Sequence, residues 1–393
     1  MQERAFLVGL DYQRKPLMPP RESLRELARL ARTAGATVVG QALQRRQRPD
    51  PATWIGAGKL EEIQAARETT GYTLVIFDEQ LSPAQQLRLE SALGVKVLDR
   101  SALILDIFAS RARTREAALQ VELAQHEYLL PRLRGQWQHL ERTEGAIGAR
   151  GPGETQLETD RRLVSARISH LKRSIESVRK QRALHRRRRE RDGIPVVALV
   201  GYTNAGKSSL LQALAGSEAF TADAPFATLD PLTRRVGAPG GHAFLLTDTV
   251  GFIQKLPTQL ISAFRATLEE LESADMLLHV VDASSPAAAA QGETVLETLH
   301  DLDLAGRPVL TVLNKADELE LPDGARPASE ADLARLDGDN PAQDSALAHP
   351  DLPHLGTLVV SALHSWGIDA LRERLAFDLF GERPATPLAS ASR

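Results

Sequence analysis

A glycine-containing loop lies between an apolar run and a stretch of helix-forming residues; it reads Gly201-Tyr202-Thr203-Asn204-Ala205-Gly206-Lys207-Ser208. The apolar run covers 195–200, and Ser209 opens the helix-forming stretch. In this order of strand, loop and helix, backbone NH groups and the positive end of the helix can surround phosphate oxygens. We expect the Lys207 side chain to reach the terminal phosphates and the Ser208 hydroxyl to ligate magnesium. The pattern predicts a nucleoside triphosphate site, and the alternative is a chance glycine turn before a helix.

A second motif, Asn314-Lys315-Ala316-Asp317, directly follows the apolar run 309–313. An aspartate at the end of a strand can accept two hydrogen bonds from the ring NH and the exocyclic amine of guanine, donors that adenine does not present in that arrangement. We expect Asp317 to make this contact, Asn314 to brace the loop and the Lys315 stem to cover the ring. Taken alone, the tetrapeptide could be a solvated turn. Its place downstream of a phosphate loop favours a guanine nucleotide.

Two further segments close apolar runs between and after these motifs. Asp248-Thr249-Val250-Gly251 follows the run 243–246. Asp248 can therefore hold magnesium through water, and the Gly251 amide can meet the γ-phosphate. Ser361-Ala362-Leu363 follows the run 357–360, and its backbone NH groups can meet the carbonyl oxygen of the base. Both segments are expected to belong to the same nucleotide site.

A magnesium-binding threonine in a mobile switch is the remaining element of such a site. The segment Phe226-Ala227-Thr228-Leu229-Asp230-Pro231 places Phe226 and Thr228 at a plausible distance after the phosphate loop. Thr233 is the competing choice for the magnesium ligand. The expected metal ligands are thus Ser208, Thr228 and Asp248.

The five motifs in this order resemble the translation-factor-related class of GTPases, and the resemblance covers about 194–377. Many GTPases of the wider superfamily place a water-orienting glutamine where this sequence has Phe252. A phenyl ring cannot position water, so we expect slow intrinsic hydrolysis that a docked partner or a cation completes. Residues assigned to catalysis are Lys207, Thr228, Gly251 and Asn204.

Asn204 is the candidate for holding that cation. Some GTPases that lack the glutamine are similar to this sequence in having an asparagine in the phosphate loop that coordinates potassium. The alternative is an asparagine that caps the helix or braces the loop. The expected cofactors are therefore Mg²⁺ and, if Asn204 coordinates potassium, K⁺.

Composition indicates a multidomain protein in which charge is separated by region. The chain has 393 residues, of which 42% are hydrophobic, and a net charge of −3. Residues 160–192 alone contain thirteen Lys or Arg and four Asp or Glu. The absence of cysteine excludes disulfides and thiolate metal sites. No apolar run approaches membrane-spanning length, so we expect a cytoplasmic protein. We also expect it to be monomeric.

Residues 1–112 alternate short apolar runs with helical periods. The expected strands are 5–9, 36–41, 73–77 and 96–98, and the expected helices are 22–33, 59–67 and 83–93. This alternation predicts a small parallel α/β domain. Gly56-Ala57-Gly58-Lys59 is an incomplete match to a second phosphate loop.

Residues 113–192 predict a long antiparallel helical hairpin. Apolar residues at helical spacing form two facing seams, Leu133, Trp137 and Leu140 on one helix and Val164, Ile168, Leu171, Ile175 and Val178 on the other. The tip would be the glycine-rich segment 144–154, with Arg150 near its centre. Beyond Val178 the sequence is strongly basic, which suits a nucleic-acid backbone, and the alternative is a solvated linker helix.

Over most of its length the sequence resembles the HflX family of GTPases, which have an α/β N-terminal domain, a helical hairpin and a GTPase domain. The matching segments are Ile55-Gly56-Ala57-Gly58-Lys59, Leu81-Ser82-Pro83-Ala84-Gln85-Gln86, Asp99-Arg100, Leu105-Asp106-Ile107-Phe108, Arg111-Ala112-Arg113-Thr114, Gln120-Val121-Glu122-Leu123-Ala124, Gly151-Pro152-Gly153-Glu154-Thr155-Gln156-Leu157-Glu158 and Ala227-Thr228-Leu229-Asp230-Pro231. The resemblance implies a P-loop GTPase domain over 193–378. The residues that follow, 379–393, are expected to form a disordered tail. An acidic tract at 317–356 would form a floppy insertion in that domain.

The same resemblance implies a factor that binds GTP and GDP, associates with the large ribosomal subunit and its RNA, and separates stalled or stressed ribosomes. Two alternatives stay open from the residues. One is a ribosome-assembly or RNA-modification GTPase, and the other is a nucleotide-dependent RNA remodeller.

Overall fold

The structure is a computed structural model that describes residues 3–12, 18–141, 152–191, 193–216, 225–226, 228–229, 231–255, 271–302, 304, 306–336 and 352–381. The chain divides into two compact units. The first contains residues 1–182 and 255–265, and the second contains 183–254 and 266–393. The predicted hairpin tip at 144–154 lies mostly outside the described residues, and so does nearly all of the predicted tail.

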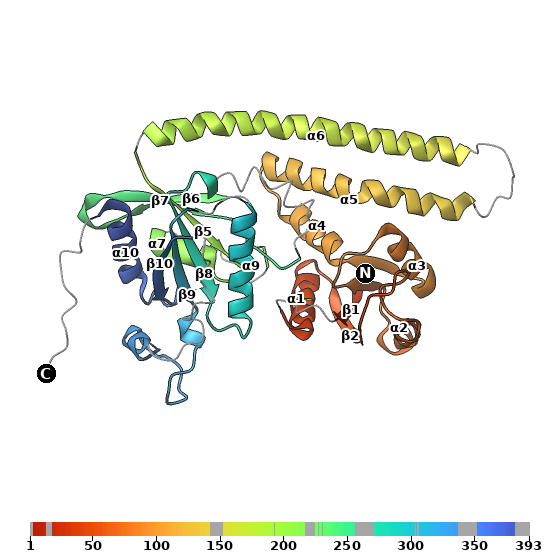
Figure 1. The fold of residues 1–393 in the computed structure, drawn as a ribbon, viewed down its shortest axis with the longest axis horizontal. Helices are drawn as coiled ribbons and strands as arrows, with labels where there is room; N and C mark the ends of the chain where they lie inside the picture. Colours follow the sequence, from red (N-terminus) through yellow and green to blue (C-terminus); the bar gives the residue numbers. More distant parts are fainter. Residues whose placement is uncertain are drawn as a thin grey trace. The chain divides into compact units, whose positions relative to one another are not determined.

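The first unit is built on a four-stranded parallel sheet in the order β2-β1-β3-β4 (Figure 1). Its strands are β1 (Arg4–Tyr12), β2 (Thr37–Arg46), β3 (Leu74–Phe77) and β4 (Lys96–Asp99). The helices between and after them are α1 (Pro20–Thr33), α2 (Ala57–Thr70), α3 (Pro83–Leu93) and α4 (Arg100–Arg111). All four residues of β3 are buried, as expected for a strand covered on both faces. The predicted parallel α/β domain is confirmed.

Local sequence signals explain where several of these helices begin. Ser82 and Gln85 form a reciprocal capping box, and Pro83 occupies the first turn of α3. Asp99 caps α4 by accepting a hydrogen bond from the Ala102 amide at 2.8 Å. The α2 helix begins after Gly56, whose amide donates to the Gln44 side chain at 2.8 Å. Lys59 pairs with Glu62 at 2.6 Å, so this geometry does not favour the second phosphate loop.

Two long helices follow, α5 (Arg115–Glu141) and α6 (Pro152–Arg191). Figure 1 shows them side by side in opposite directions. Ion pairs join them, from Arg167 to Glu122 at 2.6 Å and from Lys172 to Glu127 at 2.8 Å. On α6, Leu171 is buried and the other members of the predicted seam, Val164, Ile168, Ile175 and Val178, are half-buried. The side chains of Trp137 and Leu140 lie outside the described residues.

The second unit contains a six-stranded sheet in the order β10-β9-β8-β5-β7-β6. Its strands are β5 (Val196–Gly201), β6 (Leu232–Gly237), β7 (Ala243–Asp248), β8 (Met276–Asp282), β9 (Val309–Asn314) and β10 (His354–Val359). The edge strand β6 pairs antiparallel with β7, and the other pairings are parallel. The loops that carry the predicted motifs therefore leave one edge of the sheet.

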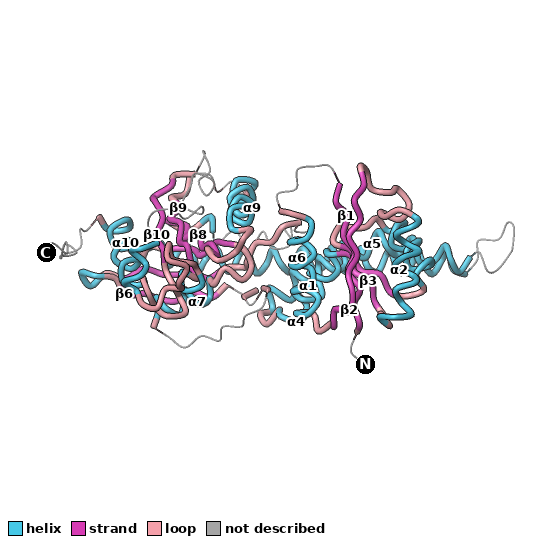
Figure 2. The backbone as a smooth tube through the Cα atoms, turned by 90° about the horizontal axis from the view of Figure 1, so that it is seen from below, coloured by secondary structure: helices cyan, strands magenta, loops and turns pink. Residues whose placement is uncertain are grey.

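Helices cover both faces of this second sheet (Figure 2). The helices α7 (Lys207–Ala215) and α10 (Ile368–Phe380) pack into one core with one face of the sheet, and α9 (Ala288–Asp301) packs on the other face. Short 3₁₀ helices are η1 (Pro239–Gly241), η2 (Ala316–Glu318) and η3 (Glu330–Leu336). The P-loop α/β fold is confirmed.

The acidic tract at 317–356 differs from the predicted floppy insertion in its described part. It contains η2 and η3, and Leu321 and Leu336 pack with Ala316 in a small core. The strand β10 already begins at His354. These few apolar residues bury enough surface to order a segment whose overall composition is acidic.

Across the described residues, no helix is both long enough and apolar enough to cross a bilayer.

Candidate nucleotide-binding site

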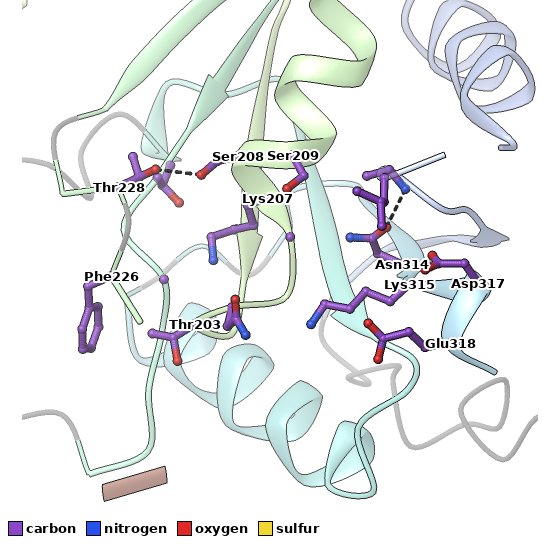
Figure 3. Close-up of a pocket in the computed structure, with 16 residues that line it drawn as sticks. Thr203, Lys207, Ser208, Ser209, Phe226, Thr228, Asn314, Lys315, Asp317 and Glu318 are labelled. Atoms are coloured by element: carbon purple, nitrogen blue, oxygen red, sulfur yellow. Dashed lines mark hydrogen bonds between the residues drawn. The ribbon is translucent and has the colours of Figure 1, made fainter. Parts of the chain in front are cut away.

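A cavity of about 480 Å³ lies where the motif loops of the second unit meet (Figure 3). Fourteen of the nineteen predicted nucleotide-binding residues line it, namely Thr203, Asn204, Gly206, Lys207, Ser208, Ser209, Phe226, Thr228, Gly251, Asn314, Lys315, Asp317, Ala362 and Leu363. Gly201, Tyr202, Ala205, Asp248 and Ser361 lie behind this lining, where several of them hold it in place. Loops that are distant in the sequence thus form one site.

The phosphate loop ends at Gly206, which is the N-cap of α7 and has a φ of 90°. A Cβ at this position would lie 2.2 Å from the Nδ2 atom of Asn314, so the close approach of the two loops requires glycine. No side chain caps α7 at this end. Its first backbone NH groups therefore face the cavity as donors for an anion.

Lys207 is buried at the floor of the cavity. Its ammonium donates to the carbonyl oxygens of Gly201 at 3.1 Å and Tyr202 at 2.8 Å. Burial lowers the pKa of Lys207 to about 8, although the nearby Asp248 carboxylate opposes this shift. Burial removes the ammonium from water, which costs free energy, so the oxygens of a bound phosphate would compensate its charge.

Three predicted magnesium ligands meet at one side of the cavity. The Oδ2 atom of Asp248 accepts hydrogen bonds from Ser208 Oγ at 2.6 Å and Thr228 Oγ1 at 2.7 Å, and the two hydroxyl oxygens are 2.8 Å apart. The Oδ1 atom of Asp248 is buried and has no hydrogen-bond partner among the described residues. These hard oxygen donors fit Mg²⁺, with Ser208 and Thr228 as ligands and Asp248 beside them. Thr233 instead bonds Thr247 on the neighbouring strand at 2.9 Å, so the geometry favours Thr228.

Asn314 braces the base end of the cavity. Its Nδ2 donates to the carbonyl of Ala205 in the phosphate loop at 2.9 Å, and its Oδ1 accepts from the amide of Ala362 at 3.0 Å. One side chain thereby holds three motif loops together. Lys315 pairs with Asp282 at 2.6 Å and has a φ of 64°.

Asp317 is positioned by a neighbouring loop. Its Oδ1 atom accepts a hydrogen bond from Ser361 Oγ at 2.5 Å. This contact holds one oxygen of a carboxylate that lines the cavity. A fixed carboxylate can select a base that presents two adjacent donors.

The segment after Asp248 is fastened to the phosphate loop. Phe252 exchanges backbone hydrogen bonds with it, accepting from the Thr203 amide at 2.7 Å and donating to the Gly201 carbonyl at 3.0 Å. A Cβ at Gly251 would lie 3.0 Å from the Lys207 ammonium. The Gly251 amide is therefore close to the position of a terminal phosphate, while the Phe252 ring is buried and absent from the described lining.

Two residues that line the cavity, Thr249 and Glu318, were not predicted from the sequence to bind nucleotide. Thr249 bonds the Leu199 carbonyl at 2.6 Å and holds the Asp248 loop against β5. Glu318 lies at the base end next to Asp317. Each adjoins a recognised motif residue, and that adjacency was the only signal in the sequence.

Comparison with known proteins agrees with this geometry. The GTPase HflX of Caldanaerobacter subterraneus subsp. tengcongensis is 50% identical over 319 residues, which cover 81% of this chain and 74% of that protein. The GTPase HflX of Escherichia coli K12 is 46% identical over 318 residues, with the same coverage. The chain belongs to the HflX family of GTPases.

Family models match three successive regions of this HflX-family chain. They describe a GTP-binding GTPase N-terminal region at 21–109, a GTP-binding GTPase middle region at 111–189 and a 50S ribosome-binding GTPase at 196–315. The crystal structure of SsGBP in complex with GDP aligns with 97% of this chain and 99% of its own, at 25% identity and a TM-score of 0.52. The chain is a GTPase, and the cavity is where its motifs converge.

Proposed function

We propose that this GTPase binds the large ribosomal subunit and separates stalled or stressed ribosomes, with GTP and GDP setting whether it engages. The observation that carries the proposal is the match of residues 196–315 to the model of a 50S ribosome-binding GTPase. Such a factor would act in the cytoplasm, where ribosomes translate.

The basic helix α6 supports an RNA partner. Arg161, Arg162, Arg173 and Lys180 are exposed along its described part, next to Arg167, Lys172 and Arg179, which pair with acidic side chains. Clustered Lys and Arg release counterions when they meet a phosphate backbone, which gives affinity with little sequence preference. The proposal assigns this helix to ribosomal RNA, and places the segment 144–154 at its end as the part that enters the ribosome.

The nucleotide state would control engagement through two segments that meet the terminal phosphate. Thr228 lies beside the magnesium site and Gly251 beside Lys207. Loss of the γ-phosphate removes the partner that both segments share, so their positions depend on hydrolysis. In this proposal Mg²⁺ held near Ser208, Thr228 and Asp248 neutralises phosphate charge.

Ribosome separation is tested by mixing the protein and a non-hydrolysable GTP analogue with intact ribosomes and following the particles by sedimentation. We expect separated subunits. A ribosome-assembly or RNA-modification GTPase would instead associate only with precursor particles. A nucleotide-dependent RNA remodeller would instead unwind an RNA duplex and leave the ribosomes intact.

Shortening the segment 145–153 should abolish ribosome separation and leave basal GTP hydrolysis unchanged. The reason is that the segment contains none of the motifs of the nucleotide site, whereas the proposal assigns it to the contact with the ribosome. Sedimentation measures the first property and phosphate release the second. A deletion of equal length within 338–350 serves as the control and should preserve both. Ribosome separation by the shortened protein would show that the hairpin mechanism is wrong.

Potassium should accelerate GTP hydrolysis about tenfold or more relative to sodium, as expected where a fixed charge stabilises phosphoryl transfer. Lys207 and Lys315 are the cationic side chains among the described lining residues, and Lys315 is paired with Asp282. Positive charge near the transferred phosphate is therefore scarce, and Asn204, in a left-handed turn with a φ of 65°, lines the cavity where a cation could supply it.

Steady-state phosphate release in matched KCl and NaCl buffers measures this difference, and Asn204→Ala should remove it. GDP affinity provides the control, because it should be the same in both salts. Equal hydrolysis rates in the two salts would exclude potassium and leave a docked partner as the source of the missing charge.

A further inference from the structure

The sheet of the first unit has a carboxyl edge at which the strand order reverses. The chain passes from β1 to β2 on one side and then to β3 on the other side of β1. In open α/β sheets, ligands bind at the carboxyl ends of the strands at such a reversal. Asp78 directly follows β3 there, and its amide donates to the Val8 carbonyl of β1 at 2.9 Å. This residue therefore stands where the architecture places a binding site.

The charges around Asp78 are unbalanced without a further cation. Its Oδ1 atom accepts from the buried Arg100 at 2.7 Å, and Arg100 also pairs with Glu26. Its Oδ2 atom accepts from Ser23 Oγ at 2.6 Å. Glu79 directly follows Asp78, so the segment carries a further carboxylate beside the two that Arg100 pairs with. We call Ser23, Asp78 and Glu79 the acidic crevice.

The cation in the acidic crevice is Lys255 of the same chain. Its ammonium lies 2.6 Å from Asp78 Oδ2, 2.8 Å from Glu79 Oε1 and 3.2 Å from Ser23 Oγ. Lys255 belongs to the first compact unit, as the crevice does. The backbone of Lys255 has a φ of 59°, a left-handed conformation that is disfavoured for a residue with a Cβ. The contacts of its ammonium with the crevice help to offset this cost.

Asp78 is a buried carboxylate that depends on the cations beside it. The carboxylate side chain is only 6% exposed. Burial alone would raise its pKa, but Arg100 and Lys255 outweigh burial and hold the pKa below its ordinary value. Removing Lys255 would leave a buried carboxylate with part of its compensation missing.

Lys255 is also close in sequence to Gly251, which lies beside the Lys207 ammonium in the nucleotide cavity. Only three residues separate it from Gly251, and two of them are fixed to the phosphate loop. Phe252 pairs with the loop through its backbone, and the Gln254 amide donates to the Tyr202 hydroxyl at 2.9 Å. A displacement of Gly251 would therefore be passed on to Lys255, because few unconstrained residues lie between them.

The conformation in which Lys255 contacts the acidic crevice is also suited to a triphosphate. Thr228 already touches Ser208 and Asp248, and Gly251 lies beside Lys207. These are the positions that a γ-phosphate and its magnesium would hold in a GTPase switch. A contact present in this conformation favours the ligand that stabilises the same conformation.

We propose that the acidic crevice is a docking site for the Lys255 ammonium, and that docking is thermodynamically linked to triphosphate binding. By linkage, docking raises affinity for GTP relative to GDP, and GTP in turn strengthens docking. This contact would report the state of the nucleotide to the N-terminal sheet.

The test uses the full-length chain with Lys255→Met, which removes the charge and keeps an apolar side chain of similar reach. Calorimetry gives the affinities for GDP and for a non-hydrolysable GTP analogue. The preference for the analogue over GDP should fall about threefold or more, the scale of a partly exposed ion pair. Hydrogen exchange of the amides at 77–81 and 20–26 should become faster with the analogue bound.

The matched control is Lys59→Met, which removes an ion pair on α2 that contains no residue of the crevice. It should change neither the affinity ratio nor the exchange. Glu79→Gln should reproduce the effect of Lys255→Met, and the double variant should be no worse than either single one. An affinity ratio equal to that of the unmodified protein, or unchanged exchange at both segments, would overturn the proposal.

Discussion

Replacing Lys207 with methionine should reduce nucleotide affinity about a hundredfold or more, the range for truncating one partner of a buried, hydrogen-bonded charge pair. The nucleotide-free protein should nevertheless be at least as stable as before. The ammonium is buried and its pKa is lowered to about 8, so folding disfavours the charged form on the order of 3 kcal/mol. Methionine removes that charge and fills similar space. Binding and stability should therefore change in opposite directions.

Thermal unfolding with and without GDP measures both effects in one experiment. The unmodified protein should gain stability on adding GDP, and Lys207→Met should lose this gain without a lower melting temperature in its absence. Lys59→Met is the control and should keep the gain. A variant that still responds to GDP would show that Lys207 does not contact the phosphates. A variant that unfolds early without nucleotide would show that its bonds to Gly201 and Tyr202 stabilise the fold.

The nucleotide cavity could be predicted because its residues follow apolar runs directly. Asp248 ends β7 and Asn314 ends β9, so a short apolar run in the sequence locates both the strand and the residue that leaves it. Parallel strands then bring these ends to one edge. The same reasoning located β3 and α3, whose start carries a complete capping box.

Features that depend on pairing between distant residues could not be predicted. The antiparallel edge strand β6 and the central strand β8 have no chemical motif to mark them. Asp99 is a helix cap by its sequence, yet it also accepts hydrogen bonds from Tyr128 at 2.9 Å and Arg132 at 3.1 Å on α5. No feature of the sequence near Asp99 predicts these partners.

The acidic crevice is the clearest example of this limit. Asp78 and Lys255 are 177 positions apart in the chain. The local sequence predicts a turn residue after a strand at Asp78 and a surface cation at Lys255. Their roles follow only from a sheet order that places β3 next to β1. Sequence patterns predict which residues leave a sheet, whereas the fold decides which of them meet.

Replacing Asp317 with asparagine should change the preferred base from guanine to xanthine, with GTP affinity falling about a hundredfold or more because a built hydrogen-bonding site rejects a mismatched partner strongly. Ser361 Oγ holds the Oδ1 atom of Asp317 at 2.5 Å, and an asparagine Oδ1 can accept the same bond. The amide nitrogen then takes the place of Oδ2. It would face the exocyclic amine of guanine, donor against donor, but would donate to the carbonyl that xanthine has there.

Calorimetry with GTP and XTP measures this exchange of preference. Glu318→Gln is the charge-matched control, since it removes a carboxylate from the same end of the cavity without altering the oxygen that Ser361 holds. That variant should keep its preference for guanine. If both variants lose affinity for GTP without gaining any for XTP, net charge rather than the geometry of Asp317 determines binding. If Asp317→Asn still prefers GTP, the base is recognised elsewhere, because no orientation of that amide can accept both donors of guanine.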